Sequence, residues 1–266
     1  MLKLINVSKT FNINTVNETK ALKDIDLEVK DNDFITIVGG NGAGKSTLLN
    51  SIAGVFDLTE GNIILSKKNI TEMPEYKRAK FIGRVFQDPL MGTSPDMTIE
   101  ENLSLALNKN SKLTLKWALN KKKREIIKEH LAEIDLGLEN RLDTKVKLLS
   151  GGQRQALTLL MATIIEPELL LLDEHTAALD PATAIKINGL TQKIISNHDI
   201  TTLMITHNMK DALRFGNRML MMNQGKIILD IKDKTKENMT IEHLLKIFQK
   251  KHKQGFYNDR TILSLA

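Results

Sequence analysis

The sequence contains no cysteine, and only 4% of its 266 residues are aromatic. Without cysteine the chain forms no disulfide and no thiolate metal site, a composition typical of a reducing compartment. The apolar run at residues 169–172 ends at Asp173 and falls far short of the ~20 residues that cross a bilayer. Residues 1–9 lack the apolar core of a secretion signal. We therefore expect a soluble chain with no secretion signal.

The chain has an excess of basic residues, with a net charge of +6 and a pI near 9.3. That excess allows nucleic acid, anionic lipid headgroups or nucleotides as partners. Two dense basic clusters occupy residues 121–124 and 250–253. Neither contains the aromatic residues with which single-strand binders stack on bases. The favoured interpretation is solvated helix surface, and no nucleic-acid partner is expected.

A predicted strand at residues 34–38 runs into a glycine-rich turn and a predicted helix at residues 46–53. The turn fits G-x-x-x-x-G-K-[ST], a loop whose backbone N–H groups bind phosphate. Lys45 would reach the β- and γ-phosphates, and the Ser46 hydroxyl would hold Mg²⁺. No G-x-G-x-x-G pattern can be read here, so a dinucleotide fold is excluded. The predicted nucleotide-binding residues of this loop are Gly39, Gly40, Asn41, Gly42, Ala43, Gly44, Lys45, Ser46 and Thr47.

A second glycine-containing turn, Ser150-Gly151-Gly152-Gln153, opens a helix predicted over residues 154–165. Ser150 is a good N-cap, but each glycine at a helix start costs up to ~1 kcal/mol relative to alanine. The cost indicates that a ligand approaches this backbone closely. Free N–H groups and the helix dipole would form a second anion site. A flexible capping turn, the structural alternative, would not require both glycines.

Polar residues follow several predicted strands. Asp173 and Glu174 end a buried strand, where one carboxylate can hold Mg²⁺ through water and the other can orient and polarise an attacking water. Gln87 ends a strand predicted at residues 83–87, at the sheet edge where ligands bind. His207 lies at the tip of a strand predicted at residues 201–206. A histidine there is more often structural, but beside a phosphate site it is a candidate γ-phosphate contact.

The remaining segments predict the frame around these motifs. Apolar and polar residues alternate within residues 1–29, which predicts antiparallel strands with one face exposed to solvent. Phe11 is predicted to lie in a polar loop between them. Phe11 is equally suited to stacking on a purine and to anchoring the loop to the core. Asp180 and Pro181 predict the N-cap and first residue of a helix.

Three further regions have patterns that predict helices or a hairpin. Residues 98–148 predict a mostly helical lobe with Trp117 packed inside it. Residues 218–230 predict a hairpin that turns at Asn223-Gln-Gly225, and residues 240–248 predict an amphipathic helix.

Taken together and in this order, the motifs resemble those of the nucleotide-binding subunit of an ATP-binding cassette (ABC) transporter, over roughly residues 2–230. The sequence departs at His175-Thr-Ala-Ala178, where many members have Pro/Ala-Thr-Ser-Ala. The resemblance implies an adenine-stacking Phe11, a Q-loop Gln87 that touches Mg²⁺ and senses the membrane partner, a signature sequence Ser150, Gly151, Gly152 and Gln153, a metal-side Asp173, a catalytic Glu174, a D-loop Asp180 and a switch His207.

The fold that the resemblance implies is α/β: a P-loop NTPase core of ABC ATPase type with an N-terminal antiparallel β subdomain and an inserted α-helical subdomain. We expect an ABC ATPase domain at residues 1–232, with the helical insert at about residues 98–150, and a C-terminal helical extension at residues 233–266. The implied activity is Mg²⁺-dependent ATP hydrolysis that energises transport of a small solute. The run at residues 173–181 is similar to a bacterial subgroup associated with amino acids, aromatic ones included.

The resemblance also implies partners. Two copies would stack head to tail, with each Ser150 helix start against the γ-phosphate on the other copy. An integral membrane permease would dock near Gln87, at the cytoplasmic face of the cell membrane, with an extracytoplasmic substrate-binding protein beyond it. The alternatives are a soluble ABC ATPase acting on nucleic acid or ribosomes, suggested by the basic balance, and a non-hydrolysing scaffold, which Glu174 and His207 argue against.

Overall fold

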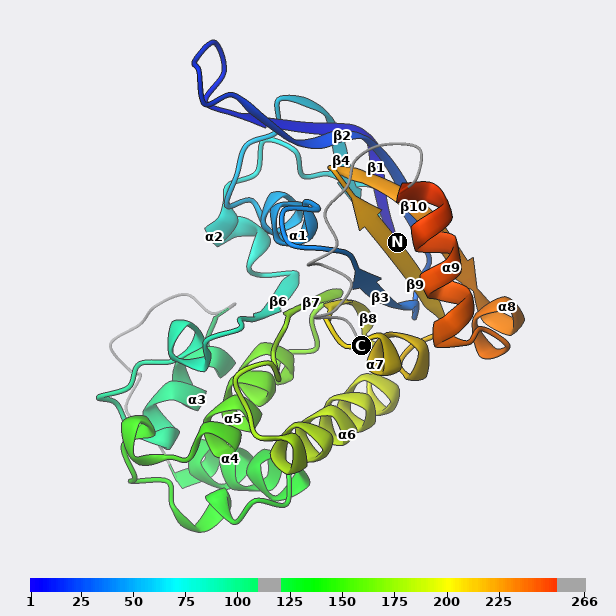
Figure 1. Ribbon diagram of the computed structural model, residues 1–266. Helices are drawn as coiled ribbons and strands as arrows, with labels where there is room; N and C mark the ends of the chain where they lie inside the picture. Colours follow the sequence, from blue (N-terminus) through cyan, green and yellow to red (C-terminus); the bar gives the residue numbers. More distant parts are fainter. Residues whose placement is uncertain (110–120, 253–266) are drawn as a thin grey trace. The chain divides into compact units, whose positions relative to one another are not determined.

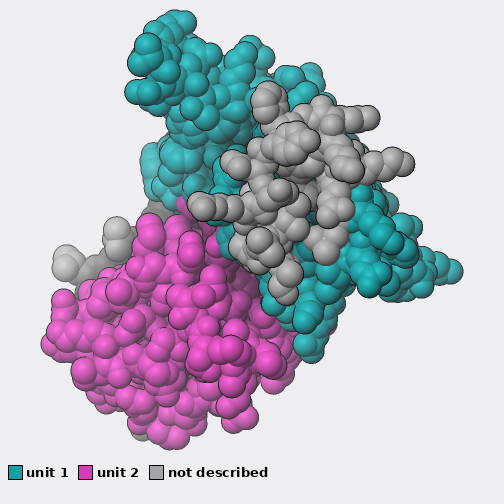
Figure 2. Space-filling model, in the orientation of Figure 1, with its two compact units in different colours: residues 1–79, 201–266 teal, residues 80–200 magenta. Residues whose placement is uncertain are grey.

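The computed structural model describes residues 1–109 and 121–252. The chain divides into two compact units (Figure 2), the first formed by residues 1–79 and the part that follows residue 200, the second by residues 80–200. The predicted helical insert at residues 98–150 and the predicted C-terminal extension at residues 233–266 divide the chain differently, and both stay a prediction. Of the helices in the described ranges, none combines the length and apolarity needed to span a bilayer.

The first unit begins with an antiparallel sheet in the order β2-β1-β4-β5. Its strands are β1 (Leu2–Phe11), β2 (Thr19–Val29), β4 (Glu60–Leu65) and β5 (Lys68–Asn69). Leu2 pairs with Val29 and Leu4 with Leu27, and all four side chains are buried. The predicted alternating strands are therefore confirmed. Phe11, however, is the last residue of β1 rather than part of a loop, because pairing with Thr19 extends the ladder to that position.

The second sheet of this unit is built around β3 (Phe34–Val38), whose five residues are all buried. It pairs in parallel with β8 (Thr201–Ile205) on one side and β9 (Arg218–Asn223) on the other. β10 (Lys226–Lys232) returns antiparallel to β9, which confirms the predicted hairpin. Burial on both faces is typical of parallel strands and explains the unbroken apolar run of β3.

Within the described residues, five helices accompany these sheets (Figure 1): α1 (Lys45–Ala53), α2 (Glu75–Arg78), α7 (Met209–Arg214), α8 (Asp233–Glu237) and α9 (Ile241–His252). Gly54 ends α1 in the left-handed conformation, with φ of 85°, which glycine adopts without steric cost. Pro74 is the N-cap of α2. The predicted C-terminal helix is α9, and Lys253 of the second basic cluster lies outside the described residues.

Arg78 fixes the C-terminal end of α1. Its guanidinium donates to the carbonyl oxygens of Ser51 and Ile52 at 2.8 and 2.9 Å, and to those of Thr71 and Met73 at 2.7 and 2.6 Å. The residue is 3% exposed. A cation at a helix C-terminus satisfies carbonyls that have no partner within the helix.

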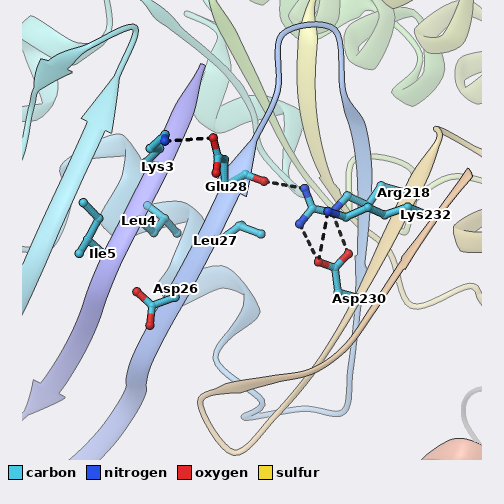
Figure 3. A pocket seen from close by; sticks show the side chains of 9 residues that line it. All are labelled: Lys3, Leu4, Ile5, Asp26, Leu27, Glu28, Arg218, Asp230 and Lys232. Atoms are coloured by element: carbon cyan, nitrogen blue, oxygen red, sulfur yellow. Dashed lines mark hydrogen bonds and ion pairs between the residues drawn. The ribbon is translucent and has the colours of Figure 1, made fainter.

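A second buried arginine joins the hairpin to the antiparallel sheet (Figure 3). Arg218 contacts Asp230 through two hydrogen bonds of 2.8 and 2.7 Å, and it donates to the Glu28 carbonyl oxygen at 2.6 Å. Around it the exposed Lys3 pairs with Glu28 at 3.0 Å. Beside this polar hollow, ion pairs thus join β1 to β2 through Lys3 and Glu28, and β9 to β10 through Arg218 and Asp230.

The described part of the second unit contains two parallel strands, β6 (Ile82–Val85) and β7 (Leu169–Asp173). Its helices are α3 (Ile99–Leu107), α4 (Lys121–Glu133), α5 (Gly151–Thr163) and α6 (Pro181–Asn197), with short 3₁₀ turns η1 (Pro89–Gly92), η2 (Leu138–Asn140) and η3 (Val146–Leu148). The predicted helical lobe is confirmed for its described part, and Trp117 lies outside it.

The strand predicted through Gln87 ends two residues earlier, at Val85. The Asp88 carboxylate accepts a hydrogen bond from the Leu90 N–H at 2.9 Å and caps η1. This cap, together with Pro89 at the first position of the turn, bends the chain away from the strand.

The first basic cluster is partly bound within the helical lobe. Arg124 pairs with the buried Glu100 and, at 2.7 Å, with Asp143. Lys123 donates to the Asn108 side chain at 3.2 Å. These contacts join α4 to α3 and favour a structural role for the cluster over nucleic-acid binding.

Candidate functional site

The glycine-rich loop has a backbone conformation that residues with a Cβ could adopt only with strain. Gly44 has φ of 99°, and a Cβ on it would lie 2.6 Å from the Ala21 carbonyl oxygen. Gly42 has φ of 75°, but a Cβ there would meet nothing within 4 Å. Gly42 is therefore required by conformation alone, and the space above it stays open. The start of α1 has no side-chain cap, which leaves its N–H groups suited to bind an anion.

Lys45 folds over this loop. Its ammonium donates to the carbonyl oxygens of Gly39 and Gly40, at 2.8 and 3.2 Å, and the residue is 6% exposed. The neighbouring Ser46 is exposed. The loop thus presents a bare backbone, one ammonium and one accessible hydroxyl within a few residues.

The two other predicted residues of the first unit lie at strand ends. Phe11 is half-buried and meets Phe56 edge to face, with ring centroids 5.1 Å apart, while the Lys9 ammonium lies 5.0 Å from its centroid. Its adenine-stacking role stays a prediction. His207 is half-buried just beyond β8, followed by Asn208, which caps α7 by accepting from the Lys210 N–H at 2.9 Å.

In the second unit, β7 delivers two carboxylates at its end. Asp173 is the last residue of the strand and Glu174 follows it with φ of 47°, in the left-handed region. A single non-glycine residue there costs about 1–2 kcal/mol. The Ala177 N–H donates to the Glu174 carbonyl oxygen at 2.9 Å and closes a turn. Both carboxylate residues are half-buried.

His175 is the buried residue of this turn. It is 2% exposed, and its Nε2 lies 3.1 Å from the Thr191 hydroxyl oxygen on α6. Burial lowers the pKa of His175 to about 4, so the ring is neutral at physiological pH. The sequence showed only that this position departs from the common family pattern; the contact with a residue sixteen positions later needs the fold.

Asp180 has the predicted capping role. Its carboxylate accepts a hydrogen bond from the Thr183 N–H at 3.1 Å, at the start of α6. Hydrogen bonds from Thr183 lower the pKa of Asp180 below its usual range.

The start of α5 combines a capping box with two glycines. The Gln153 N–H donates to Ser150 Oγ and the Ser150 N–H to Gln153 Oε1, both at 3.2 Å. A Cβ on Gly152 would lie 2.4 Å from the Thr183 methyl, whereas one on Gly151 would meet only Leu179, at 3.4 Å. Local packing therefore explains Gly152 and leaves Gly151 without a structural reason.

These same contacts place the start of α5 beside the segment that follows Glu174. Gln87 is exposed in the turn after β6, and the nearby Leu90 and Met91 are 41% and 70% exposed. Nothing in the sequence marks that apolar pair as exposed, because the exposure of a loop side chain follows no periodic pattern. The first unit thus carries Phe11, the phosphate loop and His207, and the second carries the remaining predicted site residues.

A phosphate-binding loop after a parallel strand and two acids after another define the nucleotide-binding class of P-loop ATPases. The family model for ABC transporters matches residues 22–177. A tyrosine transport ATP-binding protein of Clostridioides difficile (strain R20291) is 48% identical over 250 residues, which cover 94% of this chain and 99% of that protein. The chain belongs to the ABC transporter family, as an ATP-binding subunit with ATP hydrolase activity.

Two other comparisons agree. The energy-coupling factor transporter ATP-binding protein EcfA2 of Clostridium tetani (strain Massachusetts / E88) is 33% identical over 231 residues, 86% of this chain and 78% of that protein. A solved dimeric ATP-binding cassette in a post-hydrolysis state, bound to ADP and Pi, has a TM-score of 0.75 and 31% identity, covering 87% of this chain and 98% of its own. The predicted family and fold class are confirmed, and the nucleic-acid alternative finds no support in these relatives.

Proposed function

We propose that this ATP hydrolase energises uptake of an amino acid of the aromatic class, such as tyrosine, through a separate membrane permease. The observation that carries the proposal is the 48% identity, along almost the whole of both chains, to the protein named for tyrosine transport. The run at residues 173–181 agrees with the proposal, because it is similar to that of a bacterial subgroup associated with amino acids.

The residues present fit ATP with Mg²⁺. The uncapped start of α1 and the open space at Gly42 suit phosphate oxygens. Ser46, Asp173 and Gln87 offer the hydroxyl, carboxylate and amide oxygens that Mg²⁺ prefers. Bound Mg²⁺ would neutralise charge on the phosphates during hydrolysis. The nucleotide set otherwise comprises Phe11, the phosphate loop, residues 150–153 and Asp180.

In the proposed reaction Glu174 accepts a proton from the attacking water, and Lys45 binds the β- and γ-phosphates. His207 contacts the γ-phosphate. The start of α5 acts on the nucleotide of a second copy, head to tail, where its N–H groups stabilise the charge on the transferred phosphoryl group. The absence of a local structural reason for Gly151 supports this role, as does the dimeric arrangement named for the ADP-bound relative.

The membrane partner would dock beside Gln87. Leu90 and Met91 provide the exposed apolar surface for that contact. The chain would then lie at the cytoplasmic face of the membrane as a peripheral subunit, and an extracytoplasmic substrate-binding protein would complete the importer.

The test of the ATPase assignment is Glu174→Gln in the full-length chain. We expect ATP affinity to stay within a factor of about two and turnover to fall by about 10²–10⁴, the range of a lost general base. The matched control is Glu168→Gln, an exposed carboxylate just before the other end of β7. Normal turnover in Glu174→Gln would remove Glu174 from the mechanism.

The transport assignment needs a cellular measurement. We expect affinity purification from detergent-solubilised membranes of the source cells to recover a multi-span permease, and the Glu174→Gln variant to abolish uptake of labelled tyrosine by those cells. Recovery only from the soluble fraction, with RNA or ribosomal proteins, would contradict the proposal. A permease without tyrosine uptake would contradict only the substrate.

A further inference from the structure

The segment between β7 and α6 is held from inside by one side chain. Of residues 173–180, only His175 is buried, at 2% exposure. It directly follows Glu174, whose φ of 47° lies in a region that side chains avoid. A residue stays in such a conformation only where its surroundings hold it there.

The hydrogen bond that anchors His175 has a defined direction. The Thr191 hydroxyl has one hydrogen, and it donates that hydrogen to the Ile187 carbonyl oxygen at 2.8 Å. Thr191 Oγ1 can therefore only accept from His175, so Nε2 of the neutral ring carries the hydrogen and donates over 3.1 Å. Thr191 is itself 2% exposed, so no water replaces this bond if it is lost.

The anchor is in α6, the same helix that Asp180 caps. The turn containing Glu174 is thus tied to α6 twice: along the chain, where Asp180 accepts from the Thr183 N–H at 3.1 Å, and through the core, by the His175 ring. Because Thr191 lies well inside the helix, movement of the turn against α6 requires this buried bond to break.

We propose that His175 is a positioning residue for Glu174: its hydrogen bond to Thr191 holds the Glu174 turn in the orientation that hydrolysis requires. The proposal rests on the proposed role of Glu174 as the base. His175 itself touches neither the nucleotide nor the attacking water; it acts through the residue before it. Many family members have Pro or Ala at this position, and neither side chain has a donor for Thr191. The proposal therefore gives a role to the histidine that this sequence has instead.

The experiment compares variants of the full-length chain by the kcat and KM of ATP hydrolysis. Thr191→Val removes the acceptor at nearly constant volume, and His175→Leu removes the donor; we expect each to lower kcat about tenfold with KM for ATP within twofold. Thr191→Ser, which keeps the hydroxyl, should retain wild-type kcat. His175→Gln, whose amide can donate, should recover part of the loss seen in His175→Leu.

A matched control separates positioning from general loosening. Thr163, on α5, is 4% exposed, and its hydroxyl donates to the Leu159 carbonyl oxygen at 2.9 Å as that of Thr191 does to Ile187. Thr163→Val removes the same kind of bond without affecting a histidine, and it should keep wild-type kcat. If it lowers kcat as much as Thr191→Val does, the proposal is wrong.

The turnover of a double variant distinguishes positioning of Glu174 from a merely structural role. If His175 acts through Glu174, Thr191→Val should lower the residual turnover of Glu174→Gln by less than twofold, because the base it orients is gone. A further tenfold loss would overturn the inference, as would an unchanged kcat in Thr191→Val beside an inactive Glu174→Gln. Full activity of Glu174→Gln would instead refute the proposed base, and this inference with it.

Discussion

The Lys45 ammonium lies 2.8 Å from the carbonyl oxygen of Gly39, so the lysine contacts the first residue of the loop that it closes. Bound phosphate would offer this buried cation a charged acceptor in place of carbonyl oxygens, and charge-assisted bonds are the stronger kind. We expect Lys45→Ala to weaken ATP binding about 10- to 100-fold, measured by equilibrium titration. The exposed Lys30 provides the control variant Lys30→Ala, which should bind normally. Unchanged affinity in Lys45→Ala would mean that the phosphate loop is misassigned.

The two glycines that open α5 should respond differently to alanine. Gly152→Ala would bring a Cβ to 2.4 Å from the Thr183 methyl, so we expect a lower melting temperature. Gly151→Ala meets only ordinary contact, at 3.4 Å from Leu179, and should melt like the wild type. Its ATPase activity should nevertheless fall about tenfold, because in the proposed head-to-tail dimer the added methyl would face the nucleotide of the second copy. Full activity in Gly151→Ala would argue against a head-to-tail site.

The elements that the sequence predicted well are those set by local patterns. The run Phe34-Ile-Thr-Ile-Val38 has no breaker and ends at Gly39, and the observed strand has the same bounds. Asp180 before Pro181 and Ser150 before Gln153 are local capping signals, and both caps are present. Such features depend on neighbours within a few residues, which a sequence displays directly.

The features that the sequence did not reveal depend on distant partners. His175 and Thr191 are sixteen residues apart, and nothing in either neighbourhood indicates that they meet. Gly152 reads as a ligand-binding glycine until Thr183 is found against it. The polar neighbours of Phe11 predict a loop, whereas pairing with Thr19 extends the strand to it.

Arg78 should matter more for stability than its short helix suggests. Its guanidinium donates to four carbonyl oxygens, including those of Ser51 and Ile52 at the end of α1. Removing it takes a buried donor away from each of these oxygens, so we expect Arg78→Met to lower the free energy of unfolding by about 3 kcal/mol. Arg78→Lys should recover little, because one ammonium cannot reproduce the planar fork. The exposed Arg214 supplies the control Arg214→Met, and equal losses in urea unfolding would contradict this account.

Lys236 of α8 predicts a dependence of stability on alkaline pH. The residue is 3% exposed and donates to the carbonyl oxygens of Phe215 and, at 2.9 Å, Gly216, at the end of α7. Burial lowers the pKa of Lys236 from its ordinary value of 10.5 to about 8. Between these values the unfolded chain binds more protons than the folded one, so the contribution to stability rises with pH. It is fully present above pH 10.5 and is lost as the pH falls toward 8.

The variant Lys236→Met isolates this contribution, because it cannot titrate. We expect the stability of the wild type relative to Lys236→Met to rise by about 2 kcal/mol as the pH increases from 8 toward 10.5. Thermal melting of both proteins across this pH range measures the difference. Lys234→Met is the matched control, since Lys234 lies exposed on the same helix and its removal should leave the pH dependence unchanged. A wild-type advantage that shrinks as pH rises would mean that the ammonium, and not the amine, is the form that the folded state favours, with the carbonyl oxygens outweighing burial.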